Sequence, residues 1–207
     1  MLDNLLPERR ASRYTLLLFC VVVLIAVSGC ASPNPGAGYR AFSVGLGSQT
    51  LTDGDKDEID ATTAFSARMT YQAADMDPDA ADPLPEGLMS TVALHYTDGT
   101  DSFQGVEVAQ ERVALDLGLV HYWDLGRLRP YVGGGLTGEH AELRAVGEKE
   151  DDWSAGLYGT FGAAYFFTDR LYVDTGYRIT EGTDFSFGDL DTDLDSGTAF
   201  LSFGVSF

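Results

Sequence analysis

Apolar and polar residues alternate along most of this chain beyond residue 38, in short runs that are separated by polar segments. Successive side chains of a β-strand point to opposite faces, so this alternation predicts strands with one apolar face and one small or polar face. In the clearest run, one face carries only aliphatic side chains and the other carries small and charged ones: Val113, Leu115, Leu117 and Leu119 against Arg112, Ala114, Asp116 and Gly118.

Eight such runs are found, and their lengths are close to or above the roughly 9–11 residues with which a tilted β-strand crosses a membrane. They cover residues 39–51, 62–72, 88–97, 112–119, 129–138, 153–167, 171–180 and 199–207. An even number of amphipathic strands in series is typical of an antiparallel up-and-down barrel. The pattern therefore predicts an all-β fold, an eight-stranded transmembrane β-barrel over residues 39–207.

The connections between these runs fall into two classes. Long acidic loops are expected at 53–60, 98–104, 144–152 and 181–197, and tight turns at 124–127 and 168–170. Outer-membrane barrels have short turns on the periplasmic rim and long loops outside. The segment 73–87 departs from this rule, because it is long and falls on the short-turn rim; it indicates either an insertion or a wrong register.

The last predicted strand ends on Phe207, as bacterial outer-membrane barrels do, and segments 129–138 and 163–178 resemble stretches of the porin-like small barrels. We identify the resemblance as one to the small eight-stranded, outer-membrane-protein-A-like barrel family, over residues 39–207. It implies a fold and a place in the bacterial outer membrane, but no particular activity.

The N-terminus resembles a lipoprotein signal. Arg9, Arg10 and Arg13 precede an apolar stretch at 16–27, which is too short for a membrane-spanning helix of about 20 residues. The following Val-Ser-Gly-Cys sequence resembles a lipobox ending at Cys30. We therefore expect a signal peptide at 1–29, lipidation of Cys30, and a flexible tether at 30–38. No Asp follows Cys30, which in such lipoproteins favours the outer membrane.

Eight strands enclose only enough space for side chains, so the small face of each strand must point inward. Six charged residues share that face: Arg68, Arg112, Asp116, Glu139, Asp174 and Arg178. Unpaired charges are costly in a confined interior. We interpret the six as a structural ion-pair network in the lumen and not as a proton or ion pathway.

The chain has 32 acidic and 13 basic residues, a formal net charge of −19. This charge disfavours nucleic acid as a partner. The expected partners are outer-membrane lipid and lipopolysaccharide, and the sequence names no protein partner. Carboxylates alternate at 53–58 and 189–195, which suits weak binding of divalent cations. The first segment lacks the glycine turn and distal glutamate of an EF-hand, so a solvated anionic surface is favoured. No metal site and no cofactor is predicted.

The three histidines test for an enzyme. Some barrels of this kind are lipid A deacylases with a His-x-Ser pair, but His95, His121 and His140 all lack a serine two residues on. The sequence thus predicts a non-enzymatic barrel with a structural or surface-interaction role. Two alternatives stay open: a lipid-tethered, lipocalin-like carrier of a small apolar ligand, whose apolar face would point inward, and a narrow transporter of hydrophobic solutes.

Overall fold

The computed structural model of this chain describes residues 40–53, 58–71, 87–103, 106–145, 148–187 and 190–207. Side chains are described at 40–50, 63–71, 87–100, 109–142, 144, 151–183 and 195–207. All of these lie in one compact unit, Gly38–Phe207. The predicted signal peptide, Cys30 and the tether lie outside the described residues, so the expectations about them stay predictions.

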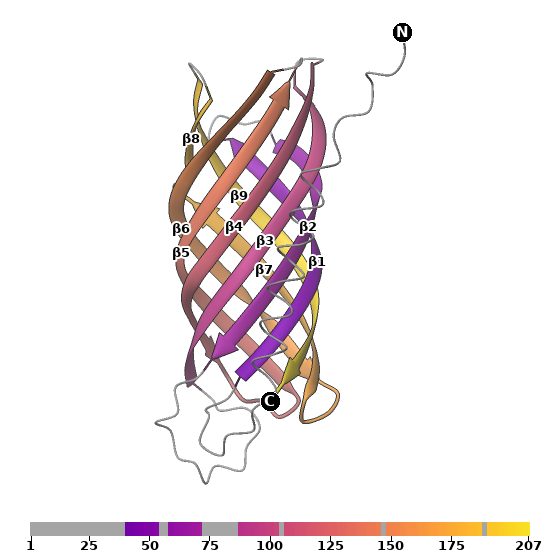
Figure 1. The fold of residues 1–207 in the computed structure, drawn as a ribbon. Helices are drawn as coiled ribbons and strands as arrows, with labels where there is room; N and C mark the ends of the chain where they lie inside the picture. Colours follow the sequence, from indigo (N-terminus) through magenta and orange to yellow (C-terminus); the bar gives the residue numbers. More distant parts are fainter. Residues whose placement is uncertain (1–39, 54–57, 72–86, 104–105, 146–147, 188–189) are drawn as a thin grey trace. The chain divides into compact units, whose positions relative to one another are not determined.

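The described chain forms nine antiparallel strands, eight of which close a barrel (Figure 1). The strands are β1 (Arg40–Asp53), β2 (Glu58–Tyr71), β3 (Gly87–Phe103), β4 (Val106–Tyr122), β5 (Leu128–Ala145), β6 (Glu148–Phe166), β7 (Leu171–Glu181), β8 (Asp184–Phe187) and β9 (Leu190–Ser206). Neighbours in sequence pair in order up to β7, β7 pairs with β9, and β9 pairs with β1 to close the wall. The short β8 adds only to β9. The predicted fold class is confirmed.

No helix among the described residues is long and apolar enough to span a membrane.

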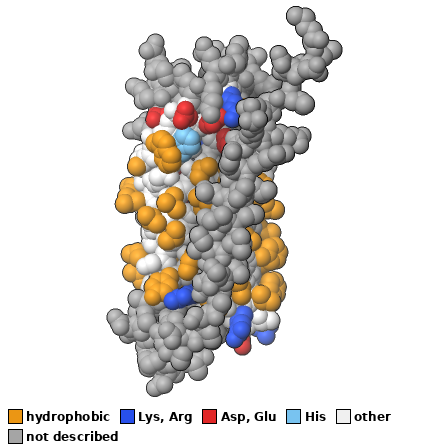
Figure 2. All heavy atoms as spheres, in the orientation of Figure 1, with side chains coloured by type: hydrophobic (Ala, Val, Ile, Leu, Met, Phe, Trp, Pro, Cys, Tyr) orange, Lys and Arg blue, Asp and Glu red, His pale blue; other side chains and the backbone are white. Residues whose placement is uncertain are grey.

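The two faces of the wall are those that the alternation predicts. On β4, Leu115, Leu117 and Leu119 are 46–51% exposed, whereas Arg112 and Asp116 are at most 2% exposed. Large apolar side chains on the other wall strands also point outward, including Leu46, Val92, Leu136, Leu157, Phe161, Leu201 and Phe203. On the face that Figure 2 shows, hydrophobic side chains lie over the middle of the wall, and charged groups lie toward its ends. A lipocalin needs the opposite arrangement, so the lipocalin-like alternative is excluded.

Local hydrogen bonds explain the two tight turns at the short-turn rim. Gly126, with φ +76°, completes the turn between β4 and β5 and donates its N–H to the carboxylate of Asp124 at 2.7 Å. The hydroxyl of Thr168 accepts the N–H of Leu171 at 3.0 Å in the turn between β6 and β7. Asp and Thr favour turns because their side chains accept such backbone bonds. Both predicted tight turns are therefore confirmed.

The end of β2 and the start of β3 pair with each other at the same rim. Tyr71, the last residue of β2, pairs with Ser90 near the start of β3, in the register that the predicted faces require. The long connection is therefore compatible with a correct register, although residues 72–86 themselves lie outside the described chain.

The predicted long loops on the opposite rim are wrong in part. The β3–β4 ladder continues to the pair Phe103 and Val106, and the β5–β6 ladder to Ala145 and Glu148. Strand β8 and the start of β9 occupy part of the predicted last loop. Polar composition suggested loops, but the ladder is held by backbone hydrogen bonds, which polar residues make equally well outside the hydrocarbon layer. These strands run past the apolar belt as paired hairpins.

Close packing explains why the inner face needs glycine. A Cβ on Gly118 would lie 2.3 Å from the carbonyl oxygen of Gly134 and 2.4 Å from the hydroxyl of Tyr158. A Cβ on Gly176 would lie 2.5 Å from the hydroxyl of Tyr131. The small face is therefore already filled by tyrosines from other strands. Space for an added hydroxyl side chain at Gly118, which the small face alone suggests, is absent.

Candidate functional site: a charged, side-chain-filled lumen

The interior of the barrel is the candidate site, because buried charged side chains from several strands lie close together there. Each wall strand contributes every second side chain to it. The structure places all six predicted lumen charges there: Arg68, Arg112, Asp116, Glu139, Asp174 and Arg178. They form two groups, one centred on Arg178 and one on Asp174.

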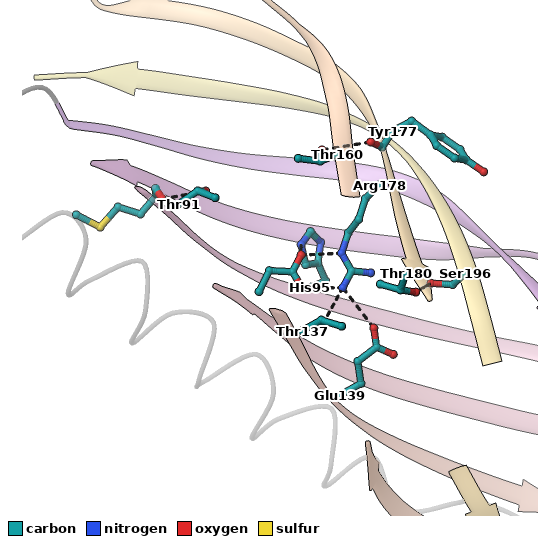
Figure 3. Close-up of polar contacts among 11 residues, drawn as sticks. Thr91, His95, Thr137, Glu139, Thr160, Tyr177, Arg178, Thr180 and Ser196 are labelled. Carbon is teal, nitrogen blue, oxygen red and sulfur yellow. Dashed lines mark hydrogen bonds and ion pairs between the residues drawn. The ribbon is translucent and has the colours of Figure 1, made fainter. Parts of the chain in front are cut away.

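Arg178 on β7 is the centre of the first group (Figure 3). Its Nε and Nη2 atoms donate to the two carboxylate oxygens of Asp116 on β4, each at 2.7 Å. Nη2 also donates to the hydroxyl of Thr137 at 3.0 Å and to Glu139 at 3.3 Å, both on β5. A planar guanidinium is suited to this two-pronged contact, since its N–H groups match the spacing of carboxylate oxygens. One side chain thus ties three strands together across the lumen.

Two further side chains complete this group. Arg112 pairs through Nη2 with the second oxygen of Glu139. Nε2 of His95 on β3 lies 3.0 Å from Oδ2 of Asp116. Both carboxylates are almost fully buried, at 1% exposure, and each contacts two nitrogen-bearing side chains. The desolvation of these charges is therefore offset by direct partners.

The second group lies around Asp174, which has 0% exposure. Arg68 from β2 pairs with one of its oxygens, and the hydroxyl of Tyr131 donates to the other at 2.9 Å. The guanidinium of Arg68 also lies 5.0 Å from the ring centre of Tyr131 and 5.8 Å from that of Phe200. Arg68 is therefore held by an ion pair and by two aromatic faces.

Apolar and aromatic side chains also pack in the interior of the barrel. Met89, Val120, Tyr122 and Tyr131 form one buried cluster, against which Phe200 packs. Tyr172 stacks on Phe166 at 4.8 Å in a second cluster toward the short-turn rim. In the described lumen, the cavity at the level of His95, Asp116 and Arg178 has a volume of about 30 Å³. That is room for about two water molecules.

One buried pair near the rim is missed by sequence reasoning. Arg129 is 4% exposed and pairs with Asp124 at 3.2 Å, with its guanidinium 5.9 Å from the ring centre of Phe166. The alternation of inward and outward side chains along β5 predicts an inward position for Arg129, because Arg129 shares the inner face with Tyr131. Asp124 also accepts a turn hydrogen bond.

The predicted carboxylate clusters at 53–58 and 189–195 fall almost wholly outside the described side chains, so weak divalent-cation binding there stays a prediction. Where side chains are described, His, Cys, Asp and Glu form no group of three or more that could hold a metal ion.

Comparison with known proteins decides the family. Residues 18–207 match the family described as "Outer membrane protein beta-barrel domain". The chain belongs to this family. Membership places the barrel in the bacterial outer membrane, with its apolar belt in contact with lipid. It also confirms the resemblance found in the sequence.

Solved structures share the fold of the family at low identity. Ail, the attachment invasion locus protein of Yersinia pestis, has a TM-score of 0.56 and 13% identity, covering 83% of this chain and 99% of that one. Neisserial surface protein A has a TM-score of 0.57 and 16% identity, with 82% and 99% covered. OprG from Pseudomonas aeruginosa has a TM-score of 0.50 and 15% identity, with 84% and 98% covered. No relative was found among curated proteins.

Proposed function

We propose that this protein is a non-enzymatic, lipid-anchored outer-membrane barrel whose lumen is closed by its own side chains, and that it acts through its surface or as a structural element. The observation that carries the proposal is the Arg178 group. Arg178 spans from β7 to carboxylates on β4 and β5, so it lies across the route that a solute would take.

The absence of catalysis is part of the proposal. Asp116 is held by Arg178 and by His95, and Glu139 by Arg112 and Arg178. A general base or nucleophile needs a free lone pair beside a substrate. These side chains instead bind one another, inside a lumen whose cavity has room for about two water molecules.

A surface role is supported by the family neighbours, whose names describe attachment and surface proteins. A further structure of Ail contains the heparin analogue sucrose octasulfate. The net charge of −19 argues against a polysulfated ligand here, because like charges repel. We therefore favour neutral or cationic partners on the outer rim.

Solute uptake by intact cells tests the closed lumen. Cells that express the barrel should take up neither arabinose nor octane faster than cells that carry an empty vector. Faster octane uptake alone would favour a transporter of hydrophobic solutes, and faster arabinose uptake would show an open pore. Either result contradicts the proposal.

The lipid anchor at Cys30 is the second part of the proposal. The barrel begins beside its own end, since Arg40 and Phe207 exchange backbone hydrogen bonds of 3.3 and 2.9 Å at the short-turn rim. A tether at 30–38 would therefore start from the rim that faces the periplasm, where an acylated cysteine can reach the inner leaflet.

Cys30→Ala behind an ordinary secretory signal should still fractionate with the outer membrane, because the apolar belt holds the barrel in lipid without an acyl chain. Labelled palmitate should mark the natural protein and not the variant. Failure to label the natural protein would refute the anchor, and recovery of folded variant from the aqueous fraction would refute its redundancy.

A further inference from the structure

The chain has two tryptophans, and each contacts a histidine at a different end of the barrel. Near the short turns, Trp123 meets His121 edge to face, with ring centres 4.8 Å apart at 77°. At the other end, Trp153 on β6 stacks on His140 of β5, with ring centres 4.6 Å apart at 27°. The second pair presents a flat aromatic surface, and the first does not.

Trp153 marks the upper limit of the apolar belt. Along the outer face of β5 and β6 the paired positions are Leu136 with Leu157, Gly138 with Ala155, His140 with Trp153, and Glu142 with Asp151. The stacked pair thus separates the last lipid-facing leucines from the first charged pair. With 73% exposure, Trp153 is the most exposed of the large apolar side chains that the structure describes.

Contacts with His140 and Asp152 fix the position of Trp153. The ring of His140 covers one of its faces, and Nδ1 of His140 lies 3.1 Å from the backbone oxygen of Asp152. The backbone N–H of Trp153 donates to the Asp152 carboxylate at 2.7 Å. An exposed side chain that is fixed in this way loses little further conformational entropy when a ligand stacks on its free face.

Polar residues follow the stacked pair along the strands toward the outer end of the barrel. Glu142 and Arg144 follow His140 on the outer face of β5 and form an ion pair with each other. The side chain of Arg144 is 41% exposed and that of Glu142 12%. Asp151, opposite Glu142, is exposed as well. Along β5 and β6, a flat aromatic surface is thus followed by residues that carry both hydrogen-bond donors and acceptors.

We propose that Trp153 and the polar groups beside it bind a neutral sugar ring of lipopolysaccharide in the outer leaflet. The ring C–H face of a sugar is apolar and suits an indole, while its hydroxyls can donate to carboxylates and accept from a guanidinium. Acyl chains do not suit the charged neighbours. The position just above the apolar belt, on the rim away from the short turns, is the level of the saccharide headgroups in that leaflet. The inference goes beyond the closed lumen and does not depend on it.

Single-tryptophan variants test the site directly. Trp123→Phe leaves Trp153 as the sole indole, and Trp153→Phe leaves Trp123 as a matched control at the other rim. Each variant is placed in phosphatidylcholine nanodiscs and titrated with purified rough lipopolysaccharide while tryptophan fluorescence is recorded. The expected result is a saturable change at Trp153 and none at Trp123.

Substitutions around the indole should weaken that response while the barrel stays folded. In the Trp123→Phe background, Arg144→Gln or Glu142→Gln is expected to raise the half-saturating concentration about tenfold, since each removes a charged hydrogen-bonding partner. His140→Ala should also weaken the response, because the indole loses its support. Phosphatidylglycerol in place of lipopolysaccharide should give no saturable change.

Three outcomes would overturn the proposal. Equal responses from the two tryptophans, or an equal response to phosphatidylglycerol, would mean that Trp153 only reports the membrane interface. If free core oligosaccharide binds as tightly as intact lipopolysaccharide, the bound sugar comes from a soluble saccharide and not from a lipid of the outer leaflet. Unchanged half-saturation in both Arg144→Gln and Glu142→Gln would remove the polar part of the site.

Discussion

Arg178→Met is expected to lower the free energy of unfolding by about 3–5 kcal/mol, the cost of breaking a buried ion pair by removing one partner. The substitution takes from Asp116 both of its 2.7 Å guanidinium contacts and from Glu139 one of two cationic partners. Both carboxylates are 1% exposed, so bulk solvent does not reach them to replace the lost contacts. Urea unfolding of the barrel in lipid vesicles measures the effect.

Two variants distinguish the loss of the ion-pair contacts from a loss of side-chain packing. Arg178→Lys keeps the charge but cannot make the two-pronged contact with Asp116, so an intermediate decrease in the free energy of unfolding is expected. Asp116→Asn combined with Arg178→Met should cost less than the sum of the single changes, with a coupling of about 0.5–3 kcal/mol. Additive losses, or a loss below about 1 kcal/mol for Arg178→Met, would show that the contacts do not stabilise the lumen.

Arg68→Met is the second large effect that we expect, again about 3–5 kcal/mol in urea unfolding. Asp174 is fully buried and would keep only the hydroxyl of Tyr131 as a partner. The stacking of the guanidinium over Tyr131 and Phe200 would be lost as well.

A second-site change provides the control. Asp174→Asn in the Arg68→Met background removes the stranded charge, so it should restore part of the lost stability. Arg127→Met, at an exposed turn position on the short-turn rim, should change stability by no more than about 0.5 kcal/mol. If Asp174→Asn lowers stability further in that background, or if Arg127→Met costs as much as Arg68→Met, burial of the ion pair is not the cause.

The faces of the strands were predictable because the two environments of the wall impose a strict period of two. Leu117 against lipid and Asp116 against the lumen follow from position alone. The partners were not predictable in the same way. Arg178 and Asp116 are 62 residues apart, and their meeting depends on strand tilt and on the stagger between strands, which parity does not encode.

Strand ends were the least predictable part of the fold. Hydropathy marks where a strand leaves the lipid, but pairing continues beyond that point, as from Asp98 and Glu111 on to Phe103 and Val106. Strand β8 alternates polar and apolar residues, but at four residues it is too short to be told from a loop by this pattern. The stacked pair of Trp153 and His140 also depends on register, since the two residues lie 13 positions apart in the sequence and on different strands.

Conductance of the unmutated protein across a planar lipid bilayer tests the central claim, the closed lumen, most directly. The ion pairs of Arg178 and Arg68 and the tyrosines packed between them should leave at most rare, small openings, because the cavity at the level of His95, Asp116 and Arg178 has room for about two water molecules. Steady, porin-sized conductance would contradict the account.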